Sequence, residues 1–173
     1  SVDSLNGAAY IVNGREEGAC VVNSIATVLR MLNKCPHGDA YRTAKSAVAQ
    51  TLPPSWIPGI DGVVLKDIGP ALDNLNIKHY FGTQAGGWKY LPHIAIVSVL
   101  EEERGHSVVF RRKEGVETIL DCNCTYPQSP SNYVLLPERQ FAGIDELSGR
   151  NNFTFHQDAA WKKWPHNPAS QGW

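Results

Sequence analysis

Hydrophobic residues in the first part of the chain recur at the spacing of helices. Over 19–32 they fall mostly three or four positions apart, which predicts a helix with one wide buried face. The same spacing over 40–52 predicts a second helix. Asp39 stands where a side chain that caps the start of this helix is expected, and Pro53 follows as a stop.

A third helix is expected within 64–75, where Ile68, Leu72 and Leu75 form an apolar stripe. Proline is tolerated in the first turn of a helix but costs about 3 kcal/mol in its interior. Pro70 therefore favours a start near 69 rather than at 64.

Beyond residue 76 the hydrophobic pattern changes to the two-residue period of strands. The apolar run 94–97 is typical of a strand covered on both faces. Two later strands are expected to form a hairpin through the turn Lys113-Glu114-Gly115. The predicted strands are 77–81, 93–100, 106–111, 117–121 and 132–136. Helices followed by antiparallel strands make the expected fold class α+β, with N-terminal helices packed on the sheet.

The chain is long enough for one domain with its own core, at 173 residues and an apolar fraction of 42%. We therefore expect residues 1–173 to form a single domain. Residues 138–173 are mostly polar but rich in aromatic side chains, which predicts a C-terminal extension packed on the body. Trp173 would also fit a C-terminus left in a protease site after self-release from a polyprotein.

Net charge and the number of cysteines restrict the expected partners and cellular compartment. Sixteen Lys and Arg against seventeen Asp and Glu give a net charge of −1, so we expect no nucleic-acid partner. No apolar run approaches the ~18 residues of a membrane span, and the first residues lack the features of a signal peptide. Four cysteines in a chain of this size favour reduced thiols over a disulfide scaffold. We therefore expect a cytoplasmic protein, in the host cytoplasm if its source is a virus or a pathogen.

Three residues in chain order supply the parts of a nucleophilic site. Cys20 opens the first predicted helix, His106 opens one arm of the predicted hairpin, and Asp121 ends the other arm. A helix start and a nearby imidazolium both lower the pKa of a thiol, which attacks as the thiolate. A carboxylate beside the imidazole would hold it in one tautomer.

The hairpin is what brings the histidine and the acid together, because paired antiparallel arms meet at their outer ends. The register is left open by the pattern. A turn centred one residue later would set Asn123 opposite His106 in place of Asp121.

Four stretches together resemble a papain-like cysteine peptidase: Gly18-Ala19-Cys20, Asp61-Gly62, Gly105-His106-Ser107 and Ile119-Leu120-Asp121. The resemblance covers about residues 8–124 and is closest to the Josephin deubiquitinases and the bacteriocin-processing peptidases. Glu17-Gly18-Ala19-Cys20 is also similar to ovarian-tumour-type deubiquitinases.

This resemblance implies a papain-like fold, with Cys20 as nucleophile, His106 as general base and Asp121 as the residue that orients it. Such peptidases also place a glutamine shortly before the cysteine as an oxyanion donor. Asn13 is the nearest amide upstream of Cys20 and is the candidate here, together with the backbone N–H of Cys20.

The expected reaction is hydrolysis of a peptide or isopeptide bond through a thioester. The expected substrate is a protein or peptide, with ubiquitin-like proteins among the candidates, and no cofactor or metal is expected. The loops 56–62 and 82–89 are where specificity would reside.

Three alternatives stay open at this point. Cys35-Pro36-His37 and Cys122-Asn123-Cys124 offer four possible zinc ligands, although the single-residue gaps are shorter than usual. Transglutaminases and arylamine acetyltransferases share the order Cys, His, Asp and are other acyl-transfer enzymes. A non-catalytic binding domain could keep the fold without the reaction.

Overall fold

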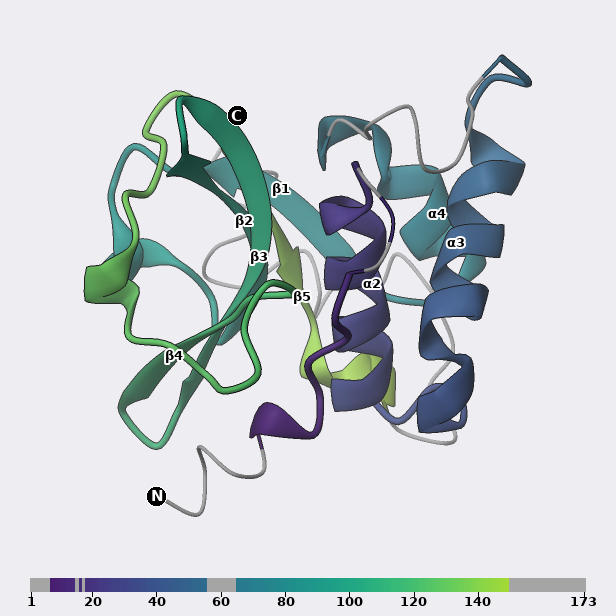
Figure 1. The fold of residues 1–173 in the computed structure, drawn as a ribbon, viewed down its shortest axis with the longest axis horizontal. Coiled ribbons are helices and arrows are strands. Elements are labelled where there is room, and N and C mark those ends of the chain that lie inside the picture. Colours follow the sequence, from purple (N-terminus) through teal and green to yellow (C-terminus); the bar gives the residue numbers. More distant parts are fainter. Residues whose placement is uncertain (1–6, 15, 17, 56–64, 150–173) are drawn as a thin grey trace.

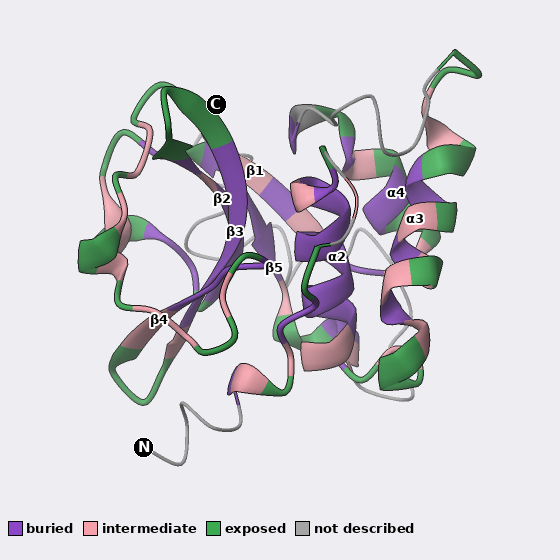
Figure 2. Cartoon of the chain, viewed as in Figure 1, coloured by how far each residue is buried: buried purple, intermediate pink, exposed green. Residues whose placement is uncertain are grey.

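Helix α2 (Cys20–Met31) lies between the sheet and the remaining helices (Figure 1). The computed structural model describes residues 7–14, 16, 18–55 and 65–149. The predicted helix over 19–32 is confirmed, but it is covered on more than one face: every residue from 21 to 29 is buried. Figure 2 shows this burial along almost the whole of α2. A helix enclosed in this way holds its first residue, Cys20, in a fixed position.

The other helices cover the outer side of α2. Helix α3 (Ala40–Thr51) packs against α2, and the short helix α4 (Gly69–Asn74) packs against α3. Both confirm the prediction, including the start of α4 at Gly69 with Pro70 in its first turn. The predicted cap is wrong: Asp39 makes no capping hydrogen bond, and its carboxylate pairs with Arg42 at 2.6 Å instead.

Five antiparallel strands form the sheet in the order β1-β5-β2-β3-β4. Their bounds are β1 His79–Thr83, β2 Ile94–Glu101, β3 Arg104–Lys113, β4 Val116–Leu120 and β5 Gln140–Ile144. The fold is therefore α+β, as predicted, with helices packed on one face of an antiparallel sheet.

Both tight turns beside β3 use left-handed backbone. Strands β2 and β3 are joined through Glu102 and Glu103, at φ 48° and 67°, and β3 and β4 through Glu114 and Gly115, at φ 53° and 79°. Two successive residues with positive φ give the type I′ turn, whose twist matches that of the strands it connects.

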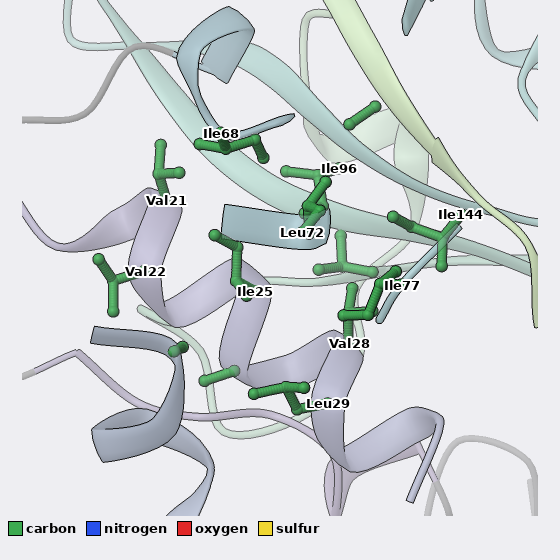
Figure 3. Close-up of a cluster of buried hydrophobic side chains, with 14 of the residues drawn as sticks. Val21, Val22, Ile25, Val28, Leu29, Ile68, Leu72, Ile77, Ile96 and Ile144 are labelled. Atoms are coloured by element: carbon green, nitrogen blue, oxygen red, sulfur yellow. The ribbon is translucent and has the colours of Figure 1, made fainter. Parts of the chain in front are cut away.

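The sheet buries apolar side chains on both faces. On the helix side, Val21, Ile25 and Val28 of α2 pack with Ile96 and Ile144 of the sheet (Figure 3). The opposite face has a second cluster under the segment that follows β4. Its buried members include Tyr80, Val97, Val99, Val108, Phe110, Ile119 and Phe141.

One prediction near the C-terminal end of the described chain is wrong, and one strand there was not predicted. The segment 132–136 forms no strand: a 3-10 turn covers Pro130–Asn132, and Leu135 makes an isolated bridge with Val99. Strand β5, which we did not predict, lies between β1 and β2. Within the predicted extension, residues 140–144 thus belong to the sheet.

The rest of the predicted extension, 150–173, lies outside the described residues, as does the loop 56–62. In the part of the chain that the structure describes, we find no helix of the length and apolar character that crossing a membrane requires.

Candidate active site

The three predicted residues come together where strand β4 stops. Strand β3 pairs with β2 over 104–111, but with β4 only from residue 109 onward. The outer edge of β3 at His106 and Ser107 is therefore not paired with β4, and α2 packs against this strand. The Cys20 thiol lies against this edge, where the backbone of Ser107 and the ring of His106 both interact with it.

Local backbone and a pair of serines fix the position of Cys20. Gly18 has φ 72°, a conformation that glycine adopts without the steric cost of a Cβ, and it lets the chain turn into α2. One turn into the helix, the hydroxyl of Ser24 donates to the carbonyl of Cys20 at 2.9 Å and lies 3.1 Å from the hydroxyl of Ser107. The start of α2 is thereby tied to β3, one residue from His106.

Both nitrogens of the His106 ring face a carboxylate. Nε2 lies 2.8 Å from Oδ1 of Asp121, and Nδ1 lies 3.3 Å from Oε2 of Glu101. Asp121 follows β4 directly and its side chain is 6% exposed, whereas that of Glu101, at the end of β2, is 45% exposed. The histidine thus has one buried and one solvent-facing acidic partner.

The register of the hairpin is the later one of the two that the sequence allows. Lys113 pairs with Val116 and Val109 with Leu120, so the same register continued would set Asn123 opposite His106. The ladder ends at Leu120, however, and the chain then bends so that Asp121 bonds His106. The backbone N–H of Asn123 donates to the same Oδ1 at 3.0 Å, so Asn123 supports the acid and does not replace it.

Asp121 is held by more than the histidine. The hydroxyl of Tyr133 donates to its Oδ2 at 2.8 Å, and the thiol of Cys124 lies 3.8 Å from the same atom. Burial raises the pKa of the Asp121 carboxyl, but the hydrogen bonds from His106, Asn123 and Tyr133 outweigh it and hold this pKa below its ordinary value. Asp121 therefore stays ionised and can hold one orientation of the ring.

The charges of Cys20 and His106 support each other. Burial raises the pKa of the Cys20 thiol, but its interactions with the His106 ring and the Ser107 backbone bring that pKa below the ordinary value. Burial lowers the pKa of His106, but its bonds to Asp121 and Cys20 and the charges of Asp121 and Glu101 raise it to about 10. A thiolate–imidazolium pair is the charge state that this arrangement favours.

A second thiol, that of Cys122, also lies beside His106 and Asp121, but its pKa is shifted in the opposite direction from that of Cys20. Burial, together with the charges of Asp121, Cys20 and Glu101, raises its pKa to about 12. Cys122 is thus a neutral, buried thiol, and Cys20 is the one suited to nucleophilic attack.

The side-chain amide of Asn13 donates hydrogen bonds to backbone carbonyls. Its Nδ2 donates to the carbonyl of Cys122 at 3.1 Å and to that of Cys124 at 2.9 Å, which occupies both N–H groups of the amide. The oxyanion role stays a prediction that this geometry does not favour. The backbone N–H of Cys20 remains as a donor, because the first helical bond of this segment runs from Asn23 to Ala19.

A cavity of about 550 Å³ opens beside the thiol. Val21 and Leu65 give it apolar walls, and Glu138 and Arg139 line it from the segment before β5. Cys20 and His106 themselves line this cavity, so a bound chain could reach both. A larger cavity of about 740 Å³ lies elsewhere and contains none of the predicted residues.

Among the described residues, one group has donor atoms close enough for a metal: His106, Asp121 and Cys122, all within 4.8 Å of one another. An ion there would compete with the His106–Asp121 hydrogen bond. The zinc set left open as an alternative is not formed, since Cys35 and His37 do not belong to this group. All four cysteines are free thiols.

Sequence reasoning missed Glu101 and Tyr133. Glu101 belongs to the acidic run 101–103, which lies between the predicted strands 93–100 and 106–111, and only the strand register places it at the end of β2. Tyr133 follows a 3-10 turn in a segment that we predicted to be a strand. No spacing rule connects Tyr133 to Asp121, because the contact depends on how that segment crosses the sheet.

No protein-family model matches the chain, and no match to it was found among curated proteins. The assignment of the site therefore depends on its geometry and chemistry.

Proposed function

We propose that this protein is a cysteine peptidase with a papain-like fold, acting through Cys20, His106 and Asp121. One observation carries the proposal: His106 interacts with the Cys20 thiol and, at 2.8 Å, with the buried carboxylate of Asp121. An imidazole between a thiol and a carboxylate provides a nucleophile, a proton carrier and the group that orients it.

In the first half of the reaction, the Cys20 thiolate attacks the carbonyl carbon of the scissile bond. The carbonyl oxygen becomes an oxyanion, which the backbone N–H of Cys20 can stabilise. As the C–N bond breaks, the His106 imidazolium gives its proton to the leaving nitrogen, and the acyl group remains on Cys20 as a thioester. Asp121 keeps the ring aligned during this transfer.

In the second half, water attacks the thioester carbon while neutral His106 takes one of the water protons. The C–S bond then breaks, the carboxylic acid product leaves, and the Cys20 thiolate is regenerated beside the imidazolium. The cycle consumes one water molecule for each bond cleaved and needs no metal or redox cofactor.

The arrangement of elements supports the papain-like fold. The nucleophile opens a helix that packs on an antiparallel sheet; the histidine lies on β3, and the acid directly follows the neighbouring strand β4. A substrate that is an extended peptide or the tail of a ubiquitin-like protein suits a site lined by Val21, Leu65 and Arg139. Four free thiols suit a reducing compartment, so we place the activity in the cytoplasm.

A second candidate is a non-catalytic binding domain with the same fold. The observation that favours it is the engagement of Asn13, since this leaves the backbone N–H of Cys20 without the side-chain amide expected to assist it. The two candidates differ in whether Cys20 reacts.

Hydrolysis by matched cysteine variants tests the proposal. Wild type, Cys20→Ala and Cys35→Ala are assayed with a peptide library and with ubiquitin chains; Cys35 is a free thiol outside the site. We expect wild type and Cys35→Ala to cleave the same substrates and Cys20→Ala to lose about 10³-fold or more. Equal cleavage by wild type and Cys20→Ala would exclude the peptidase. A Cys20 that iodoacetamide labels no faster than a free thiol would favour the binding domain.

A further inference from the structure

Glu101 is a second acidic partner of the proposed general base. Its Oε2 lies 3.3 Å from Nδ1 of His106, while Asp121 occupies Nε2 at 2.8 Å. A neutral imidazole has no net charge and one N–H, whereas the imidazolium has a positive charge and an N–H on each nitrogen. Two carboxylates, one beside each ring nitrogen, therefore favour the charged ring.

The sheet register explains why Glu101 reaches this histidine. Val99 pairs with His106 and Glu101 pairs with Arg104, so Glu101 and His106 are diagonal neighbours on the same face of the sheet. The side-chain amide of Asn123 donates to Oε1 of Glu101 at 3.4 Å. One residue thus supports both acids, since the backbone of Asn123 donates to Asp121.

The groups around His106 lie either on the protein side of the ring or on its solvent side. Asp121 after β4, Cys122 next to it and Cys20 at the start of α2 lie on the protein side of the ring. Glu101 alone reaches it from β2, at the solvent side. The remaining charged residues of this turn, 102–104, are exposed, and within the described chain the ion pairs of the histidine are with Glu101 and Asp121.

We propose that Glu101 is a positioning residue for His106: the Glu101 carboxylate forms an ion pair with Nδ1 of the ring in the resting site and keeps the ring charged beside the Cys20 thiolate. The inference rests on the proposed function, because it assigns Glu101 a task in the same site. Nδ1 is the nitrogen left for the thiol and the leaving group, since Asp121 holds Nε2. Glu101 must therefore release Nδ1 when substrate enters, and its 45% exposure permits this.

The direction of the effect follows from charge. A negative group beside the imidazolium favours the protonated ring, so it extends the pH range of the ion pair at its alkaline end. Loss of Glu101 should move the alkaline limit to lower pH and leave the acid limit, set by the thiol, with little change. A purely structural role in the turn would not move one limit alone.

The test is the titration of the His106 ring by NMR in protein labelled at histidine, with the signal assigned by its loss in His106→Gln. Glu101→Gln should lower the midpoint of the His106 titration by about 0.5–1 pH unit. This shift is smaller than that expected for a buried ion pair, because solvent screens the charge of Glu101. Glu102→Gln removes the same charge from the next residue, which is exposed, and should shift the midpoint by less than a third as much. Asn123→Ala keeps the backbone donor to Asp121 and should give a smaller shift in the same direction as Glu101→Gln.

Two outcomes would overturn the inference: no shift in Glu101→Gln, or an equal shift in Glu101→Gln and Glu102→Gln. The alkylation of Cys20 by iodoacetamide, followed across pH in the same variants, gives a second readout, in which Glu101→Gln alone should move the alkaline step. Neither measurement needs a substrate, so failure of peptide hydrolysis and failure of this inference are distinguishable.

Discussion

The ends of β4 and β2 each bring a carboxylate to His106, and they are built differently. After β4, Asp121 is buried and its two oxygens accept hydrogen bonds from His106, Asn123 and Tyr133. At the end of β2, Glu101 is about half exposed and accepts one long hydrogen bond from Asn123. It precedes a turn in which two glutamates have left-handed backbone conformations. The first region is suited to hold the ring in place, and the second to adjust its charge.

The largest expected effect comes from the buried region. Asp121→Asn keeps the shape of the side chain but removes the charge that holds the Nε2–H tautomer of His106. We expect turnover to fall by about 10²–10⁴-fold. Glu101→Gln, the same change on the exposed side, should cost less than about 10-fold near pH 7, because this contact is solvent-screened. Equal losses in the two variants would remove the distinction between the regions.

The dependence of stability on pH tests the ion pair itself. The raised pKa of His106 stabilises the fold below 6.5, its ordinary value, and this contribution is lost as pH rises through about 10. The lowered pKa of Cys20 contributes above 9.0, its ordinary value, and is lost as pH falls through the value in the folded state. Between 6.5 and 9.0, at every pH above the folded-state pKa of Cys20, the folded pair holds one proton, as the unfolded pair does, so stability should be flat there.

Removing the thiol should remove this range of pH-independent stability. In Cys20→Ser the histidine still gains its proton from pairing with Asp121, so stability should decline from about pH 6.5 upward. Urea unfolding of both proteins from pH 5 to 10 would show the difference. A wild-type curve that declines from pH 6.5 in the same way as the variant would mean that Cys20 is a neutral thiol.

A smaller effect is expected from the hydroxyl that supports Asp121. Tyr133→Phe removes a 2.8 Å bond to a buried carboxylate and should lower the free energy of unfolding by about 1–2 kcal/mol. Tyr126 is 62% exposed, so Tyr126→Phe is the matched control and should be close to neutral. If chemical denaturation gives the same value for both variants, the Tyr133 bond does not help to fix the acid.

The smallest effect belongs to the turn beside Glu101. Replacing Glu102 and Glu103 by Asn and Gly supplies the residues that a type I′ turn prefers and should raise stability by about 1 kcal/mol. Glu114→Asn, in the turn between β3 and β4, relieves only one strained position and serves as the comparison. Thermal unfolding would measure both. A loss of stability in the double variant would show that the glutamates are not strained.

The helices and the hairpin were predictable because their signals are local. Apolar spacing set α2 and α3 within two residues, and a hairpin brings the segments that carry His106 and Asp121 close together. The register was not predictable, because Lys113-Glu114-Gly115 allows two turn centres. Asp121 bonds His106 in the later register only because the chain leaves the ladder after Leu120.

Strand β5 was not predicted because its formation depends on contacts that are distant in sequence. Gln140-Phe141-Ala142-Gly143-Ile144 is short and contains a glycine, which is unfavourable in an isolated strand. Gly143 is needed by packing that is distant in sequence, since a Cβ there would lie 2.6 Å from the ring of Tyr80. The contacts of Glu101 and Tyr133 with the site likewise arise from pairing across the sheet, which single-sequence patterns do not encode.

The reactivity of Cys20 at mildly acidic pH tests the central claim most directly. At pH 6 a thiol with the ordinary pKa of 9.0 is ionised to well under 1%. Labelling by iodoacetamide is followed at the Cys20 peptide by mass spectrometry, in wild type and in His106→Gln. If Cys20 and His106 form the ion pair, wild type should react at least ~10-fold faster than the variant at this pH. Equal rates in the two proteins would contradict the account.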